Sequence, residues 1–144
     1  MNPFTMTGLE LLQAMYDGRI PSASMGQVIP MHGTDMAPGL MRMATQADDR
    51  HLNPMGGVHG GFAATVLDSV TGCAVHTMLE AGVGYATVDL QIKMVRPVPK
   101  NTPLVAEGRL LNMSKSIAIA EGDLKTAEGK LLAHATCTCM IIRS

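Results

Sequence analysis

The sequence contains no tryptophan and only two tyrosines and two phenylalanines in 144 residues. Aliphatic, methionine and alanine side chains must therefore form most of any hydrophobic core. Apolar residues make up 47% of the chain and charged residues 16%, a composition that excludes an intrinsically disordered protein. A chain of this length is expected to fold as a single domain spanning residues 1–144.

An excess of one charge is also missing, because the formal net charge is −1. The sequence therefore has no electrostatic basis for binding nucleic acid. Residues 92–144 do carry eight Lys or Arg side chains against four acidic ones. This local excess is typical of ordinary solvated strand faces, and a basic rim for a phosphate-bearing small molecule is the alternative.

Long hydrophobic runs are absent as well. No segment approaches the ~20 apolar residues that a membrane-spanning helix needs, and the first residues lack the pattern of a signal peptide. Three cysteines, Cys73, Cys137 and Cys139, show no spacing typical of a zinc site. We therefore expect a cytoplasmic protein with reduced thiols, without a metal site and without membrane association.

The hydrophobic pattern predicts two helices of different character. Residues 7–17 begin with Thr7 and place Glu10 at the spacing of a capping box, so residues 1–25 are expected to form a helical extension. Residues 60–79 form a longer helical segment with apolar side chains around its whole circumference, which indicates burial on all sides. The only charged residue in this second segment is Asp68.

Strands are predicted on both sides of the long helix, at residues 40–47, 85–95, 104–113, 117–126 and 130–142. Within residues 85–95, the alternation places Val88, Leu90, Ile92 and Met94 on one face. The breaks before residues 117 and 130 predict hairpins. The order favours an α+β fold in which an antiparallel meander wraps around one long central helix. Open edges of such a sheet invite pairing with a second copy.

A glycine-rich segment, Asn53 to Gly61, precedes the long helix and ends in His59-Gly60-Gly61. The first N–H groups of a helix have no acceptor within the helix, and glycine lets a ligand approach them closely. Together with the helix dipole, the Gly60 N–H is suited to stabilise a developing negative charge as an oxyanion hole. A turn that needs glycine only for its backbone geometry is the alternative.

Asp68 is the second chemical feature, because a carboxylate in an apolar helix is costly to bury without a partner. It is a candidate general base or nucleophile. The alternative is a structural role in which Asp68 bonds to Ser69 or Thr65. Gly60 lies about 12 Å from Asp68 along one helix at 1.5 Å per residue. If both act on one substrate, Asp68 must come from another chain, which predicts an obligate dimer with two shared sites.

The pattern Asn53-Pro-x-Gly-x-x-His59-Gly60-Gly61, followed by Asp68, resembles the hotdog-fold acyl-CoA thioesterases of the phenylacetate-pathway (PaaI-like) type. Residues 86–90, 96–98 and 129–136 are similar to strands of that family, and the resemblance covers about residues 40–142. It implies the hotdog fold, an antiparallel sheet wrapped around one long helix. It also implies homodimers formed through continuous sheets, often paired further into tetramers.

The resemblance implies hydrolysis of acyl-CoA thioesters without a metal or redox cofactor. The backbone N–H of Gly60 would polarise the thioester carbonyl, and Asp68 of the partner subunit would activate water or attack the carbonyl directly. Asn53 would position the nucleophile or its loop, and Thr87 would place a hydroxyl near the attacking water. His59 would orient the loop rather than exchange protons.

Four residues are expected to contact the substrate: Gly61, Arg96, Lys115 and Ser116. The last two lie in the segment Met113-Ser114-Lys115-Ser116, where many relatives carry a Gly-Arg-like turn. Arg96, Lys100 and Lys115 are the candidates for contacts with the phosphates of coenzyme A. The remaining histidines show no ligand spacing and are interpreted as non-functional: His32, His51, His76 and His134.

Other functions remain open. A non-catalytic acyl-CoA binding or sensing protein can use the same fold, and a purely structural oligomer would not need the glycine-rich loop. Cysteine stands at position 73, where related hydratases carry histidine, and this argues against hydration.

Overall fold

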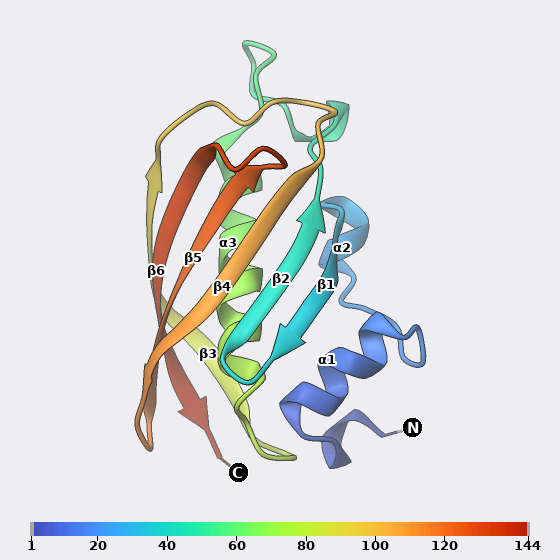
Figure 1. Cartoon of the computed structure of the whole chain (residues 1–144), viewed down its shortest axis with the longest axis vertical. Coiled ribbons are helices and arrows are strands. Elements are labelled where there is room, and N and C mark those ends of the chain that lie inside the picture. The colour runs from blue at the N-terminus through green and yellow to red at the C-terminus, as the bar shows by residue number, and fades with distance from the viewer. Residues whose placement is uncertain (1, 144) are drawn as a thin grey trace.

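A long helix lies against one face of a six-stranded antiparallel sheet in the computed structural model, which describes residues 2–143 (Figure 1). The α+β fold with a hotdog architecture is therefore confirmed. In chain order, the elements are a 3-10 turn at Pro3–Thr5, α1 Gly8–Tyr16, α2 Met25–Val28, β1 Met31–Ala37, β2 Leu40–Thr45, a 3-10 turn at Asp49–His51, α3 Gly60–His76, β3 Gly84–Met94, β4 Leu104–Met113, β5 Ile117–Thr126 and β6 Leu131–Ile142.

The strands follow the order β1-β2-β4-β5-β6-β3 across the sheet. The two predicted hairpins join β4 to β5 and β5 to β6. The expected meander is wrong for β3, which pairs with β6 at the edge of the sheet rather than with β4. Residues 95–103 carry the chain from β3 across the end of the sheet to β4 (Figure 1). Arg96-Pro-Val-Pro99 suits this crossing, because proline cannot donate to a strand ladder.

Two paired glycines let α3 approach the sheet very closely. Gly108 of β4 and Gly122 of β5 are register partners, and both lie beneath the middle of the helix. A Cβ atom added at Gly108 would lie 2.2 Å from the carbonyl oxygen of Val70, and one at Gly122 would lie 2.9 Å from Cγ2 of Thr71. Only glycine fits such an approach of sheet to helix backbone.

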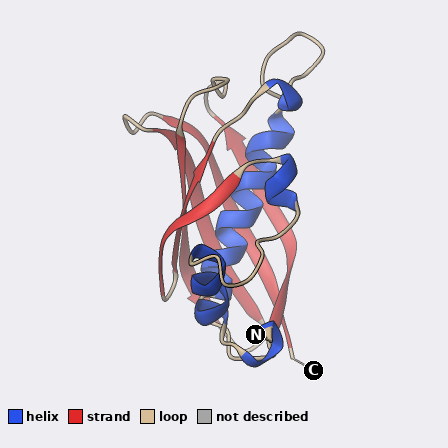
Figure 2. Cartoon of the chain, turned by 90° about the vertical axis from the view of Figure 1, so that its right-hand side faces the viewer, coloured by secondary structure: helices blue, strands red, loops and turns tan. Residues whose placement is uncertain are grey.

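The helix is not buried on all sides within one chain. Its sheet-facing residues, including Phe62, Val66 and Val70, are buried. The face with Thr65, Asp68 and Ser69 is only half-buried. The short helices α1 and α2 lie on the same side of the sheet as α3, beside β1 (Figure 2). The sequence predicted burial on all sides because the side chains around the helix are apolar or small. Composition alone does not show which of these faces the sheet covers and which stays partly open in one chain.

The N-terminal extension forms the predicted capped helix. The Thr7 hydroxyl accepts from the Glu10 N–H at 3.2 Å, and the Glu10 carboxylate accepts from the Thr7 N–H at 2.8 Å, which is the expected capping box. Gly8 packs against the carbonyl of His76 at the end of α3. The extension is thereby joined to the C-terminal end of the central helix.

A β-bulge at Val88 changes the direction of the side chains along β3. The pairing shifts between Thr87 and Asp89, so residues on either side of the bulge both face the helix. Thr87 contacts Asp68 in α3, while Leu90 packs on the core and Val88 is 55% exposed. The predicted common face of Val88 and Leu90 is therefore wrong, because an extra residue reverses the alternation.

Arginines on the opposite face of the sheet are paired with carboxylates. Arg109 donates to Glu107 at 2.8 Å, to Glu121 at 3.0 Å and to Asp123 at 2.9 Å. The hydrogen bond from Arg42 lowers the pKa of Glu107. Arg109 is therefore one of the positive charges of residues 92–144 that lie on a strand face and are paired there. No helix within residues 2–143 is long and apolar enough to cross a membrane.

Replacing Gly108 by alanine tests the close packing of α3 on the sheet. We expect Gly108→Ala to lower the free energy of unfolding by about 3 kcal/mol, because the new methyl group meets backbone atoms that cannot move aside. The matched control is Gly84→Ala in β3, where a Cβ would meet no atom within 4 Å. Denaturant unfolding of both variants at one protein concentration measures the difference, and equal stability would contradict this account.

Candidate functional site

The side chain of His59 caps the N-terminus of α3. Its Nδ1 accepts the N–H of Gly61 at 2.8 Å. Since a backbone N–H can only donate, the proton of a neutral ring is on Nε2. A Cβ at Gly61 would lie 2.9 Å from Nδ1, which explains why glycine occupies this position. The Gly61 N–H is thus already used within the chain, and any substrate contact of Gly61 stays a prediction.

Gly60 presents the free donor at this helix end. Among residues 2–143, no acceptor is hydrogen-bonded to the Gly60 N–H. The partial positive charge of the helix N-terminus adds to this donor. A Cβ at Gly60 would lie 3.0 Å from both Sδ and Cε of Met94, so the glycine also makes room for this side chain. The arrangement is suited to an anionic or polarised oxygen.

Asn53 organises the loop that leads to the helix. Its Oδ1 accepts from the N–H of Met55 at 2.9 Å and from the N–H of Gly57 at 3.1 Å. Its own N–H donates to the carbonyl of Gly57 at 2.8 Å. These bonds support the positioning of the loop, one of the two roles expected for Asn53.

His51 also positions this loop and was missed at the level of sequence. The ring is buried, with Nδ1 accepting the Asp48 N–H at 3.0 Å and Nε2 lying 2.5 Å from the Val28 carbonyl oxygen. The carbonyl of His51 accepts the His59 N–H at 2.7 Å. The bond to Val28 joins a segment 23 residues away, which residue spacing could not reveal. Nearby, donation from the Arg50 guanidinium holds the pKa of Asp48 well below its ordinary value.

Asp68 has a partner, but not either of the two expected ones. The hydroxyl of Thr87 donates to Asp68 Oδ1 at 2.9 Å, whereas Thr65 donates to the carbonyl of Gly61. No other side chain among residues 2–143 is hydrogen-bonded to the Asp68 carboxylate. The bond brings together two residues from the predicted site and holds one carboxylate oxygen toward β3.

The two chemical features stay apart within one chain. Gly60 is at the start of α3 and Asp68 is halfway along it, about 12 Å away at 1.5 Å per residue. Asp68 lies where the half-open face of α3 meets the edge strand β3. A single chain therefore presents a hydrogen-bond donor and a carboxylate in separate places.

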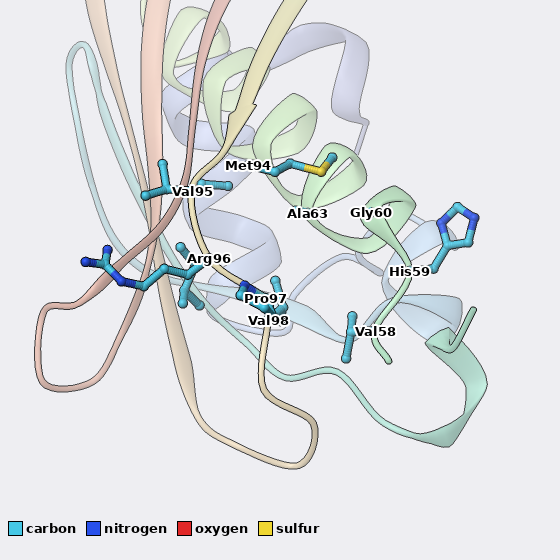
Figure 3. A pocket seen from close by; sticks show the side chains of 11 residues that line it. Val58, His59, Gly60, Ala63, Met94, Val95, Arg96, Pro97 and Val98 are labelled. Atoms are coloured by element: carbon cyan, nitrogen blue, oxygen red, sulfur yellow. The ribbon is translucent and has the colours of Figure 1, made fainter. Parts of the chain in front are cut away.

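A cavity of about 300 Å³ adjoins the Gly60 end of the helix (Figure 3). Its walls are mainly apolar and include Val58, Ala63, Met94, Val98 and Leu132. Arg96 also borders it, but its guanidinium points away from the helix in Figure 3 and donates to the Leu131 carbonyl at 2.7 Å. Arg96 therefore lies at the Gly60 end of the chain, with its guanidinium already bonded to a backbone carbonyl.

Lys115 and Ser116 lie at the β4–β5 hairpin, at the opposite end of the sheet from Gly60 (Figure 1). Lys100 is paired with Asp49 at 2.8 Å. One chain does not bring Lys115 and Ser116 to the helix N-terminus. Their contact with a substrate stays a prediction that requires a second chain.

The three thiols lie close to Asp68 without forming a metal site. Cys137 and Cys139 are on one face of β6, with their Sγ atoms 3.5 Å apart and both buried. Burial and the nearby Asp68 raise the pKa of the Cys73 thiol to about 12, so this thiol is protonated at neutral pH. Within residues 2–143, no group of three or more His, Cys, Asp or Glu side chains is placed to hold a metal ion.

Known proteins share this arrangement of elements. Residues 55–133 match the family model described as "Thioesterase superfamily". Human acyl-coenzyme A thioesterase 13 is 27% identical over 135 residues, which cover 93% of this chain and 94% of the human protein. The structure of a phenylacetic acid degradation-related protein from Ralstonia eutropha has a TM-score of 0.82 and 30% identity, covering 90% of this chain and 98% of that one.

A hypothetical thioesterase protein from Streptococcus pneumoniae, solved with coenzyme A, has the same fold. Its TM-score is 0.72 and its identity 22%, over 79% of this chain and 88% of that one.

The cap formed by His59 is tested by two substitutions. We expect His59→Ala to lower the free energy of unfolding by about 1 kcal/mol, because the Gly61 N–H loses its acceptor. His59→Asn should retain most of the stability, since its amide oxygen can accept the same bond. Denaturant unfolding at one protein concentration measures the stability of both variants. An equal loss of stability in the two would show that His59 stabilises the protein by packing of its ring and not by the hydrogen bond to the Gly61 N–H.

Proposed function

The chain belongs to the thioesterase superfamily, and from this premise we propose that it hydrolyses acyl-CoA thioesters to a free acid and coenzyme A. The observation that carries the proposal is the open Gly60 N–H at the start of α3, beside an apolar cavity. The likeness to human acyl-coenzyme A thioesterase 13 over 93% of the chain supports a CoA thioester as the substrate class.

In this mechanism the thioester carbonyl oxygen accepts the Gly60 N–H. Negative charge grows on this oxygen as a nucleophile adds to the carbonyl carbon. The N–H and the dipole of α3 stabilise that charge more than they stabilise the neutral carbonyl. The His59 cap supports the same step, because it occupies the Gly61 N–H and leaves the Gly60 N–H as the donor without an acceptor.

Asp68 supplies the nucleophilic side of the reaction in one of two ways. As a general base, it accepts a proton from the water that adds to the carbonyl carbon. As a nucleophile, its oxygen adds instead and forms an anhydride, which water then hydrolyses. In both routes the carbon–sulfur bond breaks and coenzyme A leaves as a thiol after protonation. Thr87 orients the carboxylate through the bond to Oδ1.

The site is shared between two chains in this proposal. The half-open face of α3 and the free edge of β3 adjoin at the Asp68–Thr87 bond. A two-fold axis perpendicular to α3 and β3 at this border joins two β3 edges and sets two α3 helices antiparallel, so that Gly60 of one chain faces the Asp68 side of the other. Such dimers would pair further into a dimer of dimers.

The remaining predicted residues have supporting roles. Asn53 holds the loop before Gly60, and Gly61 allows the His59 cap. Arg96 would meet a phosphate of coenzyme A at the rim of the cavity, while Lys115 and Ser116 would contact the substrate of a neighbouring chain. No metal or redox cofactor takes part, and the proposed place of action is the cytoplasm.

Thiol release from a panel of short, medium, long-chain and aryl acyl-CoAs tests the proposed activity. We expect turnover by the wild-type protein and a loss of at least about 10²-fold in Asp68→Asn, because the amide cannot accept a proton or attack. Asparagine retains an oxygen that can accept from Thr87, so the fold is preserved. Saturable binding of acyl-CoA without thiol release would instead identify a binding or sensing protein.

Complementation tests whether Gly60 and Asp68 of different chains form one site. Gly60→Pro deletes the N–H at the first helical position, where proline is tolerated, and should lower turnover about 10²–10³-fold. Gly60→Ala is the control that keeps the N–H. When inactive Gly60→Pro and Asp68→Asn chains are unfolded and refolded together, random pairing should restore roughly a quarter of the activity, since half of the dimers have one intact site. If mixed dimers form but activity does not return, Gly60 and Asp68 do not act together across two chains.

A further inference from the structure

The cavity beside Gly60 defines which part of a thioester it accepts. It begins at the helix N-terminus, where Gly60 lines it together with Ala63 of the next helical turn. A substituent attached to a carbonyl held by the Gly60 N–H would therefore enter this cavity. The reasoning rests on the proposed function, because it takes the Gly60 N–H as the carbonyl's donor.

The walls of the cavity suit the acyl group of the thioester better than the pantetheine arm of coenzyme A. Val58, Val98 and Leu132 contribute aliphatic surface. The rings and charges at the rim point outward in Figure 3, where the imidazole of His59 and the guanidinium of Arg96 both extend away from Met94. Two amides of a pantetheine arm would lose their hydrogen bonds in such a cavity, whereas an uncharged acyl group loses none.

Met94 forms the movable wall of this cavity. It is the last residue of β3, and its side chain crosses to α3 near Gly60 and Ala63 (Figure 3). Its Sδ and Cε are both 3.0 Å from the place of a Cβ at Gly60, so its thioether lies directly against the donor residue. Met94 is 57% exposed and its side chain is unbranched, so it can change rotamer more readily than a β-branched residue.

We propose that Met94 is a specificity-determining residue that sets how much bulk an acyl group can carry next to its carbonyl, and that the cavity it lines takes uncharged acyl groups. The carbons bonded to the carbonyl lie closest to Gly60 and therefore against the Met94 thioether. An acyl group that is branched at the carbon next to the carbonyl collides with the Met94 side chain. A linear acyl chain extends past Met94 into the apolar cavity. A terminal carboxylate on the acyl group is excluded by the lack of an inward-facing charge.

The test compares butyryl-CoA with isobutyryl-CoA, which have the same atoms but differ in branching at the first carbon. We expect Met94→Ala to raise the ratio of kcat/KM for isobutyryl-CoA over butyryl-CoA about tenfold, because a removed side chain of this size relieves that much discrimination. Met94→Phe should lower the ratio. Succinyl-CoA should be a poor substrate for the wild type and for both variants.

Two controls make the result specific. Met78→Ala removes the same side chain from the other end of α3, where Met78 is 44% exposed, and should leave the ratio unchanged. Met94→Leu keeps a similar volume and should fold as the wild type. If Met94→Ala is unstable, this variant shows whether the shape of the side chain at position 94 changes the ratio. A ratio that stays within about twofold of the wild type in Met94→Ala, Met94→Phe and Met94→Leu would overturn the assignment.

Binding separates this proposal from the catalytic one. S-butyl-CoA and S-isobutyl-CoA are thioethers that cannot be hydrolysed, and their dissociation constants are measured by calorimetry. If the wild type releases no thiol from any thioester, hydrolysis is wrong, yet a Met94-dependent preference between the two thioethers would still establish the cavity as the acyl site. If thioesters are hydrolysed and neither ratio depends on Met94, only the role of Met94 is wrong.

Discussion

The backbone-to-backbone approach of α3 to the sheet is the constraint on which the remaining structure depends. Gly108 and Gly122 face each other across β4 and β5, and the carbonyl of Val70 occupies the space that a side chain at Gly108 would need. This close packing fixes the distance of α3 from the sheet and the direction of its axis. Its N-terminus is therefore held at the end of the sheet, next to the segment that crosses from β3 to β4 (Figure 1).

This placement produces a cavity and a donor in the same location. The crossing segment and the end of β3 supply the apolar walls, and the first residue of α3 supplies an N–H without an acceptor among the described residues. In the proposed hydrolysis, stabilising the developing charge requires a donor that is already oriented before the reaction. Here a capped helix terminus provides that orientation, because His59 and Asn53 use their hydrogen-bonding capacity to hold the backbone around Gly60.

The same packing leaves one face of α3 only half-buried. Sheet residues cover one face of α3, and the extension lies beside β1, so the face with Asp68 borders the free edge of β3. The bulge at Val88 turns Thr87 toward this face. The proposed dimer uses both open surfaces together. It also resolves the 12 Å separation of Gly60 and Asp68 along one helix, which no rearrangement within a single rigid helix could shorten.

Local patterns in the sequence were sufficient to predict the capped N-terminal helix, the long helix and the strands that follow it, and they marked Gly60 and Asp68 as the candidate site residues. Each depends on neighbours within a few residues: a capping box, an apolar period, a glycine pair or a lone carboxylate. The edge position of β3, the bulge at Val88, the anchoring of the loop by His51 and the contact of Met94 with Gly60 could not be read in this way. They arise from contacts between residues far apart in the chain, and strand pairing and side-chain direction are settled only when those segments pack together.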